Sequence, residues 1–152
     1  MPSVPYVKQE HPHWCGPAAL LMVLKFFGME KTQADLAELL KTSEEKGTSE
    51  EMMEIVAHDL GFDVRTGSGV YEEIVRALEG GSMVIVAFVE PQDGEGHYAV
   101  VTDANSDRIR LLDPASAKDA QSILTKEGFI KRWGKKYSAH HQWFMILKPQ
   151  KR

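Results

Sequence analysis

The sequence predicts an α+β fold, with helices in the first half of the chain and a twisted antiparallel sheet in the second. Two patterns lead to the α+β prediction. Apolar residues recur at helical spacing from Cys15 to Phe27, whereas the run from Met83 to Val89 is continuously apolar, as in a central strand. Because the helices precede the strands and do not alternate with them, a segregated arrangement is favoured over repeated strand–helix–strand units.

The segment from Cys15 to Phe27 is predicted to be the central helix. It is apolar almost all round, which is typical of a helix buried on every side. Pro17 suits the first helical turn, where its missing N–H costs nothing, and Gly28 suits the helix end.

Three further helices are expected before the sheet is complete. One begins at Thr32, and another begins at Thr48, where Glu51 three residues later gives a capping-box pattern. The second of these should end at Gly61, and a third short helix should begin at Tyr71.

The strands are expected where apolar or alternating runs are bounded by turn residues. They are predicted at residues 62–66, 83–89, 97–104, 108–114 and 143–149. A turn-prone "NSD" joins the third and fourth of them, which predicts a hairpin. A helical turn from Thr125 should place Phe129 and Trp133 on one side.

Composition is that of an ordinary globular domain, and residues 1–152 are expected to form a single one. The formal net charge of -4 argues against nucleic acid as a partner. No run approaches the ~20 apolar residues of a membrane span, and no signal-peptide pattern opens the chain. One cysteine cannot form an internal disulfide, so a reducing, cytoplasmic location is expected. Oligomeric state is not predicted.

Cys15 is the residue on which function depends, and three interpretations are open. A lone cysteine is most often a small buried core residue. Cys15, however, stands at the start of the central helix and not on its apolar face. Unsatisfied N–H groups and the helix dipole favour a thiolate there, so a lowered pKa and a nucleophilic role are expected.

The second interpretation is a metal ligand. His11, His13 and Cys15 alternate along an extended segment and could share one side of it. Zinc would need a further ligand from His97, His140 or His141. The spacing matches no established zinc motif, and Pro12 restricts the backbone.

The third interpretation is a catalytic nucleophile, which needs a base, a group that orients the base, and donors for an oxyanion. His97 begins one strand of the predicted hairpin and Asp113 ends the other, so the two side chains should lie within hydrogen-bond reach. Gln9, shortly before Cys15, carries an amide that could donate to an oxyanion.

Taken together, these residues resemble a family pattern. A Gln, then Cys15-Gly16 at a helix start, then "HYAVV" from His97 and Asp113-Pro114 are similar to the double-glycine leader peptidases of bacteriocin-exporting transporters, which are papain-like cysteine peptidases. The late "GFIKRWG" is also similar to a segment of that family. The resemblance implies Cys15 as nucleophile, His97 as base and then acid, Asp113 as orienting group and Gln9 as oxyanion donor, with no cofactor.

The chain also departs from that family. Relatives often carry Asp directly before the cysteine, where this chain has Trp14. No transporter segments follow, so the expected substrate is a peptide or a small amide and not specifically a double-glycine leader. Three functions remain in competition: a thiol hydrolase of peptide or amide bonds, a peptide-binding module that no longer turns over, and a zinc-binding protein. Specificity, and whether the acyl group goes to water or to another acceptor, are not predicted.

Overall fold

The computed structural model describes residues 3–91, 94–115, 121–133 and 142–150. The helices in this part of the chain are α1 (Cys15–Phe26), α2 (Gln33–Leu39), α3 (Glu50–Asp59), α4 (Tyr71–Glu79) and α5 (Lys126–Trp133). The strands are β1 (Phe62–Ser68), β2 (Met83–Val89), β3 (Gly96–Ala104), β4 (Arg108–Leu112), β5 (Gln121–Thr125) and β6 (Trp143–Pro149).

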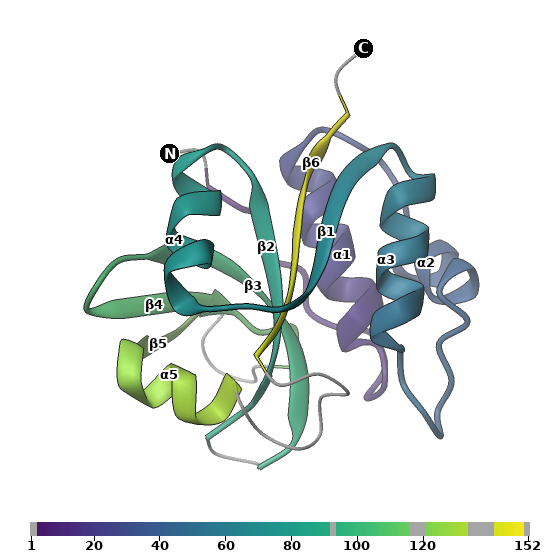
Figure 1. Ribbon diagram of the computed structural model, residues 1–152. Coiled ribbons are helices and arrows are strands. Elements are labelled where there is room, and N and C mark those ends of the chain that lie inside the picture. The colour runs from purple at the N-terminus through teal and green to yellow at the C-terminus, as the bar shows by residue number, and fades with distance from the viewer. Residues whose placement is uncertain (1–2, 92–93, 116–120, 134–141, 151–152) are drawn as a thin grey trace.

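The described strands form one sheet in the order β1-β6-β2-β3-β4-β5. Every neighbouring pair is antiparallel, including the predicted β3–β4 hairpin. Helices α1 to α3 come first in the chain and lie together beside the curved sheet (Figure 1). The predicted α+β class is therefore confirmed.

Strand β2 is continuously apolar because helices cover both faces of the sheet. Ile85 packs into the cluster formed with α1, α2 and α3, whereas Val84 and Val86 pack into the cluster formed with α4 and α5. Successive side chains of a strand point to opposite faces, so a strand buried on both sides shows no polar alternation. Phe129 and Trp133 lie on one side of α5, as the sequence predicted, and their rings stack at 5.2 Å between centroids in the second cluster.

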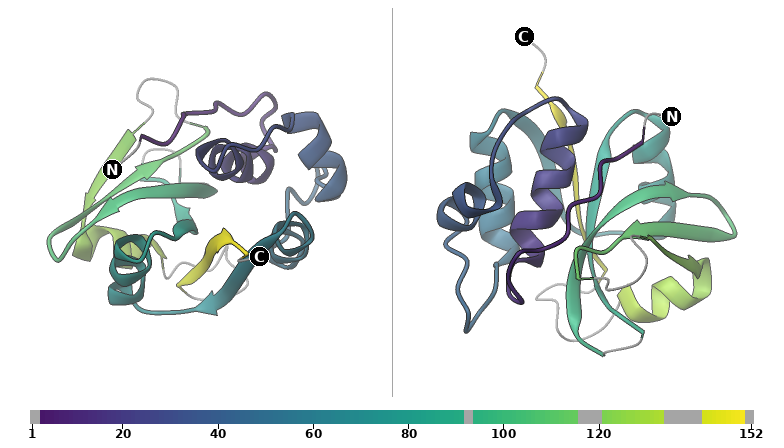
Figure 2. Two further views of the ribbon diagram at one scale, coloured as in Figure 1. Left: turned by 90° about the horizontal axis from the view of Figure 1, so that it is seen from above. Right: turned by 180° about the vertical axis from the view of Figure 1, so that it is seen from behind.

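Helix α1 is the central helix of the first cluster. Every residue from Gly16 to Leu24 is buried. It packs against β3 on one side and α2 on another, whereas α3 packs on β1, as the view from above shows (Figure 2). The predicted buried helix is confirmed, and within the described residues no helix is long and apolar enough to cross a bilayer.

The start of α3 corrects a sequence prediction. Ser49, and not Thr48, caps this helix, and its hydroxyl accepts a hydrogen bond of 3.1 Å from the Met52 N–H. The Thr48 hydroxyl is instead hydrogen-bonded to the Thr42 hydroxyl at 2.7 Å. With that hydroxyl already engaged and Thr48 buried, the next residue takes the capping role.

Strand β5 was missed by the sequence prediction. Residues Gln121 to Thr125 pair with β4 and form an edge of the sheet. Successive residues of β5 alternate between exposed and partly buried, and Ile123 is 53% exposed. An edge strand with so little burial carries a weak apolar signal, which is why its pattern does not stand out.

Candidate active site

Cys15 is the first residue of α1, and no side chain caps the N-terminus of that helix. Trp14 occupies the capping position without a side-chain hydrogen bond to the helix. The thiol faces backbone N–H groups of Tyr98, Gly16 and Cys15 itself. The contact with the Tyr98 N–H brings the sulfur against β3. Tyr98 is the residue directly after His97 on that strand.

The electrostatics of Cys15 differ from the sequence prediction. Burial of the sulfur is the largest influence and raises the pKa of the thiol, and the Asp113 carboxylate acts in the same direction. The three backbone N–H groups lower the pKa but do not outweigh burial. The expectation of a lowered pKa at the helix start is therefore wrong for the thiol by itself. A thiolate here needs a neighbouring group to take the proton.

His97 and Asp113 form the hydrogen bond that the hairpin predicted. The imidazole Nδ1 lies 2.7 Å from the Asp113 carboxylate Oδ2. Val100 of β3 pairs with Leu112 of β4, so Asp113, just past the end of β4, lies diagonally across from His97 on the same face. Both side chains are largely buried, at 10% and 2% exposure. Water therefore competes little for this contact.

Asp113 is held from several sides. Its Oδ1 accepts a hydrogen bond of 2.9 Å from the Ala115 N–H. Its backbone carbonyl accepts one of 2.8 Å from the Tyr6 hydroxyl. The Gln9 N–H donates to the Pro114 carbonyl at 3.0 Å. The extended segment before α1 is thus tied to the turn that carries the carboxylate.

Gln9 lies close to this turn, but its side chain is engaged elsewhere. The amide Nε2 donates to the His11 carbonyl at 3.1 Å and to the Pro12 carbonyl at 2.9 Å. Both N–H groups of the amide are therefore used to hold the loop before Cys15. The Oε1 atom is buried and has no hydrogen-bond partner in the described part of the chain.

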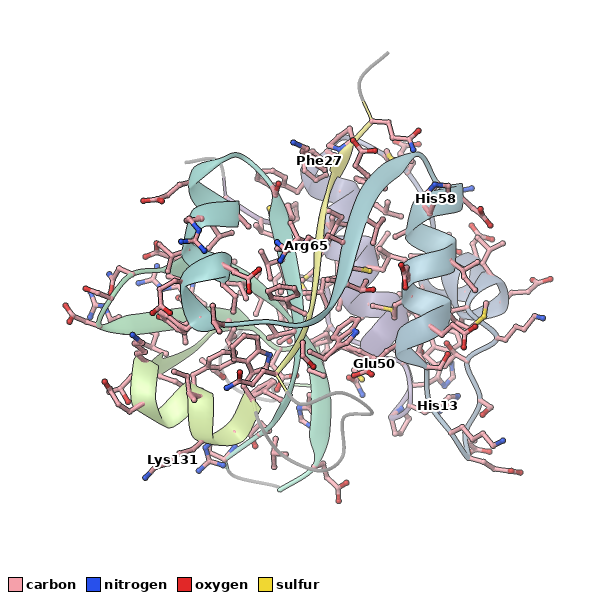
Figure 3. All side chains as sticks on the ribbon, viewed as in Figure 1. His13, Phe27, Glu50, His58, Arg65 and Lys131 are labelled. Atoms are coloured by element: carbon pink, nitrogen blue, oxygen red, sulfur yellow. The ribbon has the colours of Figure 1, made fainter. Side chains whose placement is uncertain are left out.

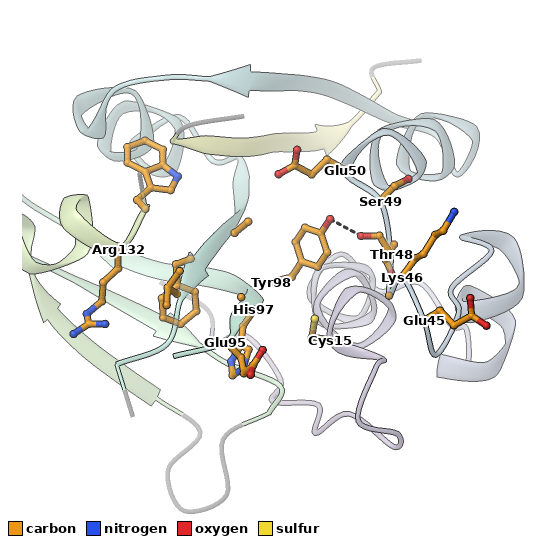
Figure 4. Close-up of a pocket in the computed structure, with 16 residues that line it drawn as sticks. Cys15, Glu45, Lys46, Thr48, Ser49, Glu50, Glu95, His97, Tyr98 and Arg132 are labelled. Atoms are coloured by element: carbon orange, nitrogen blue, oxygen red, sulfur yellow. Dashed lines mark hydrogen bonds between the residues drawn. The ribbon is translucent and has the colours of Figure 1, made fainter. Parts of the chain in front are cut away.

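A cleft of about 560 Å³ contains both Cys15 and His97 in its lining (Figure 4). One side is formed by residues 45–50, which comprise the end of the loop before α3 and the first residue of α3, hereafter the 45–50 wall. The opposite side is formed by residues 87–89 at the end of β2 and residues 95–98 at the start of β3 and just before it, with Arg132 and Trp133 of α5. Figure 3 shows the labelled His13 and Glu50 at the same end of the molecule, where α1 and α3 both begin. The positive ends of two helices therefore lie at this cleft.

Sequence reasoning missed the residues that shape this cleft. Tyr98, inside the recognised "HYAVV" segment, donates its hydroxyl to the Thr48 carbonyl at 2.7 Å. Gly16, inside the recognised Cys-Gly pair, lies so close to Thr48 that a Cβ atom would come within 2.6 Å of its hydroxyl oxygen. Both residues stood in the motif, but only the fold shows that they meet Thr48.

Among the described residues, the structure brings together no set of side chains for the alternative zinc site. His11 and His13 lie with ring centroids 5.9 Å apart, and His11 packs edge-on against Trp14 at 4.3 Å. Over residues 3–91, 94–115, 121–133 and 142–150, no group of three or more metal-ligating side chains comes together. His140 and His141, named as further ligands, lie outside those ranges.

Helices packed on an antiparallel sheet, with the central helix beginning at a cysteine, define the papain-like class of cysteine-peptidase folds. The model of the peptidase C39 family matches residues 3–140. The chain belongs to this family.

Individual relatives agree with this assignment. The chain is 33% identical over 131 residues to a lactococcin-A transport/processing ATP-binding protein, LcnC, of Lactococcus lactis, and the match covers 84% of this chain. It spans only 17% of the length of that relative. The peptidase domain of the Streptococcus transporter ComA superposes with a TM-score of 0.76 and 25% identity, covering 97% of this chain and 100% of that domain.

A further solved structure is similar in fold. A double-glycine motif protease from an AMS/PCAT transporter, in complex with its leader peptide, matches with a TM-score of 0.75 and 17% identity. The match covers 97% of this chain and 93% of that protease. A protein with this fold thus binds a peptide.

Proposed function

We propose that the protein is a thiol hydrolase of peptide bonds, with Cys15 as nucleophile, His97 as general base and then acid, and Asp113 as the group that orients His97. The observation that supports this most strongly is the buried hydrogen bond of 2.7 Å between His97 Nδ1 and Asp113 Oδ2 beside a cleft that Cys15 lines. Burying a carboxylate costs free energy, and buried carboxylate–imidazole pairs are typical of functional sites.

Asp113 determines which nitrogen of His97 is available. With the Nδ1 proton donated to the carboxylate, the Nε2 atom of the neutral ring carries a lone pair and accepts a proton. The same carboxylate stabilises the imidazolium that forms. Because burial raises the pKa of the Cys15 thiol, this proton transfer is what generates the nucleophile.

The reaction then runs in two halves. The Cys15 sulfur forms a bond to the carbonyl carbon while its proton passes to His97. His97 returns that proton to the leaving amine as the C–N bond breaks, which leaves an acyl group on the sulfur. Water adds to this thioester, gives one proton to His97, and the thiol is restored as the acid product departs.

The developing oxyanion needs donors, and two are proposed. The Cys15 backbone N–H at the uncapped start of α1 is one. The Gln9 amide is the other. One of its hydrogen bonds, to the His11 or the Pro12 carbonyl, must be exchanged for the oxyanion when substrate binds.

Substrate class is proposed from the relatives and from the cleft. The name of LcnC describes transport and processing, and the AMS/PCAT protease was crystallised with a leader peptide. A cleft of about 560 Å³ between the 45–50 wall and β3 is large enough for several residues of an extended peptide. We therefore propose a peptide substrate in preference to a small amide.

A second function is favoured by one observation. The raised pKa of Cys15 fits a peptide-binding module in which the thiol stays neutral and inert. The two functions differ in whether His97 activates the sulfur.

Alkylation of Cys15 by iodoacetamide near pH 6 separates the two functions. For a hydrolase we expect rapid alkylation of the wild type and at least a tenfold slower rate in His97→Ala, because the imidazole no longer accepts the proton. Equal, slow rates in both proteins would leave the binding module as the better description. Alkylation of Cys15→Ala gives the background.

A further inference from the structure

The 45–50 wall belongs to a loop that is held together by its own hydrogen bonds. The Ser43 and Gly47 backbones exchange two hydrogen bonds, of 3.1 and 2.8 Å. The Ser43 hydroxyl also accepts one of 3.0 Å from the Lys46 N–H, and the Thr42 and Thr48 hydroxyls are bonded at 2.7 Å. A loop bonded to itself in this way moves as a unit, so its distance from the sheet depends on its ties to other elements.

Tyr98 of β3 provides one such tie between the sheet and the wall. Its hydroxyl donates to the Thr48 carbonyl at 2.7 Å, and its ring is 8% exposed and packs edge-on against Trp143. Its own backbone N–H faces the Cys15 sulfur. A single residue of β3 thus contacts the thiol with its backbone and the opposite wall with its side chain, as Figure 4 shows for the hydroxyl.

Gly16 makes the second contact. The Thr48 side chain packs directly onto Gly16, in the space that a Cβ atom would occupy. Thr48 is therefore pressed against the start of α1 on one side and bonded to β3 on the other. The position of the wall relative to Cys15 is fixed by these two contacts together.

We propose that the Tyr98 hydroxyl is a positioning group that sets the width of the peptide cleft by holding the 45–50 wall at a fixed distance from Cys15. The proposal rests on the proposed function for its catalytic consequence, but not for its structural one. Loss of the hydroxyl leaves the buried Thr48 carbonyl without this donor, and the wall shifts toward water to satisfy it. Substrate binding weakens, whereas the His97–Asp113 pair and the Cys15 N–H are unchanged.

The test compares Tyr98→Phe with Tyr71→Phe. Tyr71 is a matched control because it is 2% exposed and its hydroxyl also donates to backbone carbonyls, those of Asn105 and Arg108 at 2.7 and 2.9 Å. Both changes remove one buried hydroxyl and keep the ring, but Tyr71 lies away from the cleft lining. Any difference between the variants therefore reports position and not the general cost of losing a hydrogen bond.

The first readout is amide hydrogen exchange at Met52, whose N–H is hydrogen-bonded to the Ser49 hydroxyl where the wall meets α3. We expect exchange to become about fivefold faster in Tyr98→Phe, the factor that corresponds to one typical net hydrogen bond, and to stay at the wild-type rate in Tyr71→Phe. Unchanged exchange in Tyr98→Phe would overturn the proposal.

The second readout is peptide cleavage. We expect Tyr98→Phe to raise KM about fivefold with kcat nearly unchanged, and Tyr71→Phe to alter neither. An equal fall in kcat for both variants, with KM unaltered, would contradict a positioning role. If the wild type cleaves no peptide but the exchange rates change as expected, the proposed function fails and the positioning of the wall stands.

Discussion

The proposed chemistry of this site depends on two features: the burial of the Cys15 thiol and the carboxylate partner of His97. Burial raises the pKa of the thiol, so the helix start alone does not make a thiolate. In the proposed mechanism, the imidazole that Asp113 holds at 2.7 Å accepts the thiol proton, which the helix start alone does not remove. In this scheme the nucleophile exists only as part of the pair.

Asp113→Asn tests the orienting carboxylate. The amide has nearly the same shape but no charge, and its NH₂ group donates where the Nδ1–H of His97 must also donate. We expect kcat for peptide cleavage to fall about 10²- to 10⁴-fold, while the protein stays folded. Asp103→Asn, an exposed residue on the same hairpin, should leave kcat unaltered. If kcat fell by similar factors in the two variants, the orienting role proposed for Asp113 would be contradicted.

The pH dependence of alkylation tests the electrostatics of the sulfur. In His97→Ala the thiol titrates without its base, and burial raises its pKa, so less thiolate is present at any given pH. We expect the midpoint of the rate–pH profile with iodoacetamide to lie above that of an exposed cysteine peptide measured alongside. A midpoint at or below that of the peptide would mean that the backbone N–H groups dominate, as the sequence alone suggested.

At this scale, the sequence could predict contacts carried by regular structure and not those carried by loops. The His97–Asp113 hydrogen bond follows from antiparallel pairing, which the turn between the strands made visible. The Gln9 amide lies on an irregular segment, and no periodicity indicates that it would bond the His11 and Pro12 carbonyls. The catalytic roles of all four residues stay predictions.

At the level of elements, the site forms where the start of α1 meets the loop before α3. Gly16 is required because Thr48 occupies the space beside it. The Cys-Gly pair therefore has a packing explanation in addition to any chemical one, because a side chain at position 16 would push the 45–50 wall away from Cys15.

Gly16→Ala tests this contact. The added Cβ would lie 2.6 Å from the Thr48 hydroxyl oxygen, so backbone or side chain must shift. We expect the free energy of unfolding to fall by about 1–3 kcal/mol in urea titration, the usual cost of overpacking. Gly80→Ala is the control, because its Cβ would meet its nearest neighbour, the Arg76 carbonyl, at an ordinary 3.5 Å. Equal effects of the two substitutions would show that the Thr48 contact yields without cost.

The elements themselves were largely predictable, with informative exceptions. Helix α1 and strand β2 carry long apolar patterns, and the sequence placed both. The cap of α3 was placed one residue early because Thr48 and Ser49 are both good caps, and only the fold shows that Thr48 is engaged with Thr42. The 45–50 wall was not foreseen, because a charged loop carries no pattern that says which cleft it borders.

For the whole molecule, the two-sided burial of the sheet fixes where the cleft opens. Both faces of the sheet are covered by helices, and the cleft is lined instead at the end of β2, the start of β3 and the starts of α1 and α3. Figure 1 shows where these elements lie in the fold. The α+β class and the family were predicted from the sequence and are confirmed. A single domain over residues 1–152 and a cytoplasmic location stay predictions.

Tyr71 gives the stability a predictable alkaline dependence. Burial raises the pKa of Tyr71 from 10.0 to about 12. A group whose folded-state pKa is raised stabilises fully below its unfolded pKa, and that contribution is lost as the pH rises through the folded value. The difference in unfolding free energy between wild type and Tyr71→Phe should therefore shrink between pH 10 and about 12. Urea titrations at pH 7, 9 and 11 measure this, and a constant difference would contradict it.

The claim that Cys15 is the nucleophile is tested most directly by a library of peptides that carry a thiol-reactive carbonyl group, with intact-mass analysis of the protein. We predict one adduct per chain, localised to Cys15 by peptide mapping, with a strong preference among library sequences and slower formation in His97→Ala. Cys15→Ala should form none. Labelling that is unselective among the peptides and indifferent to His97 would contradict the account.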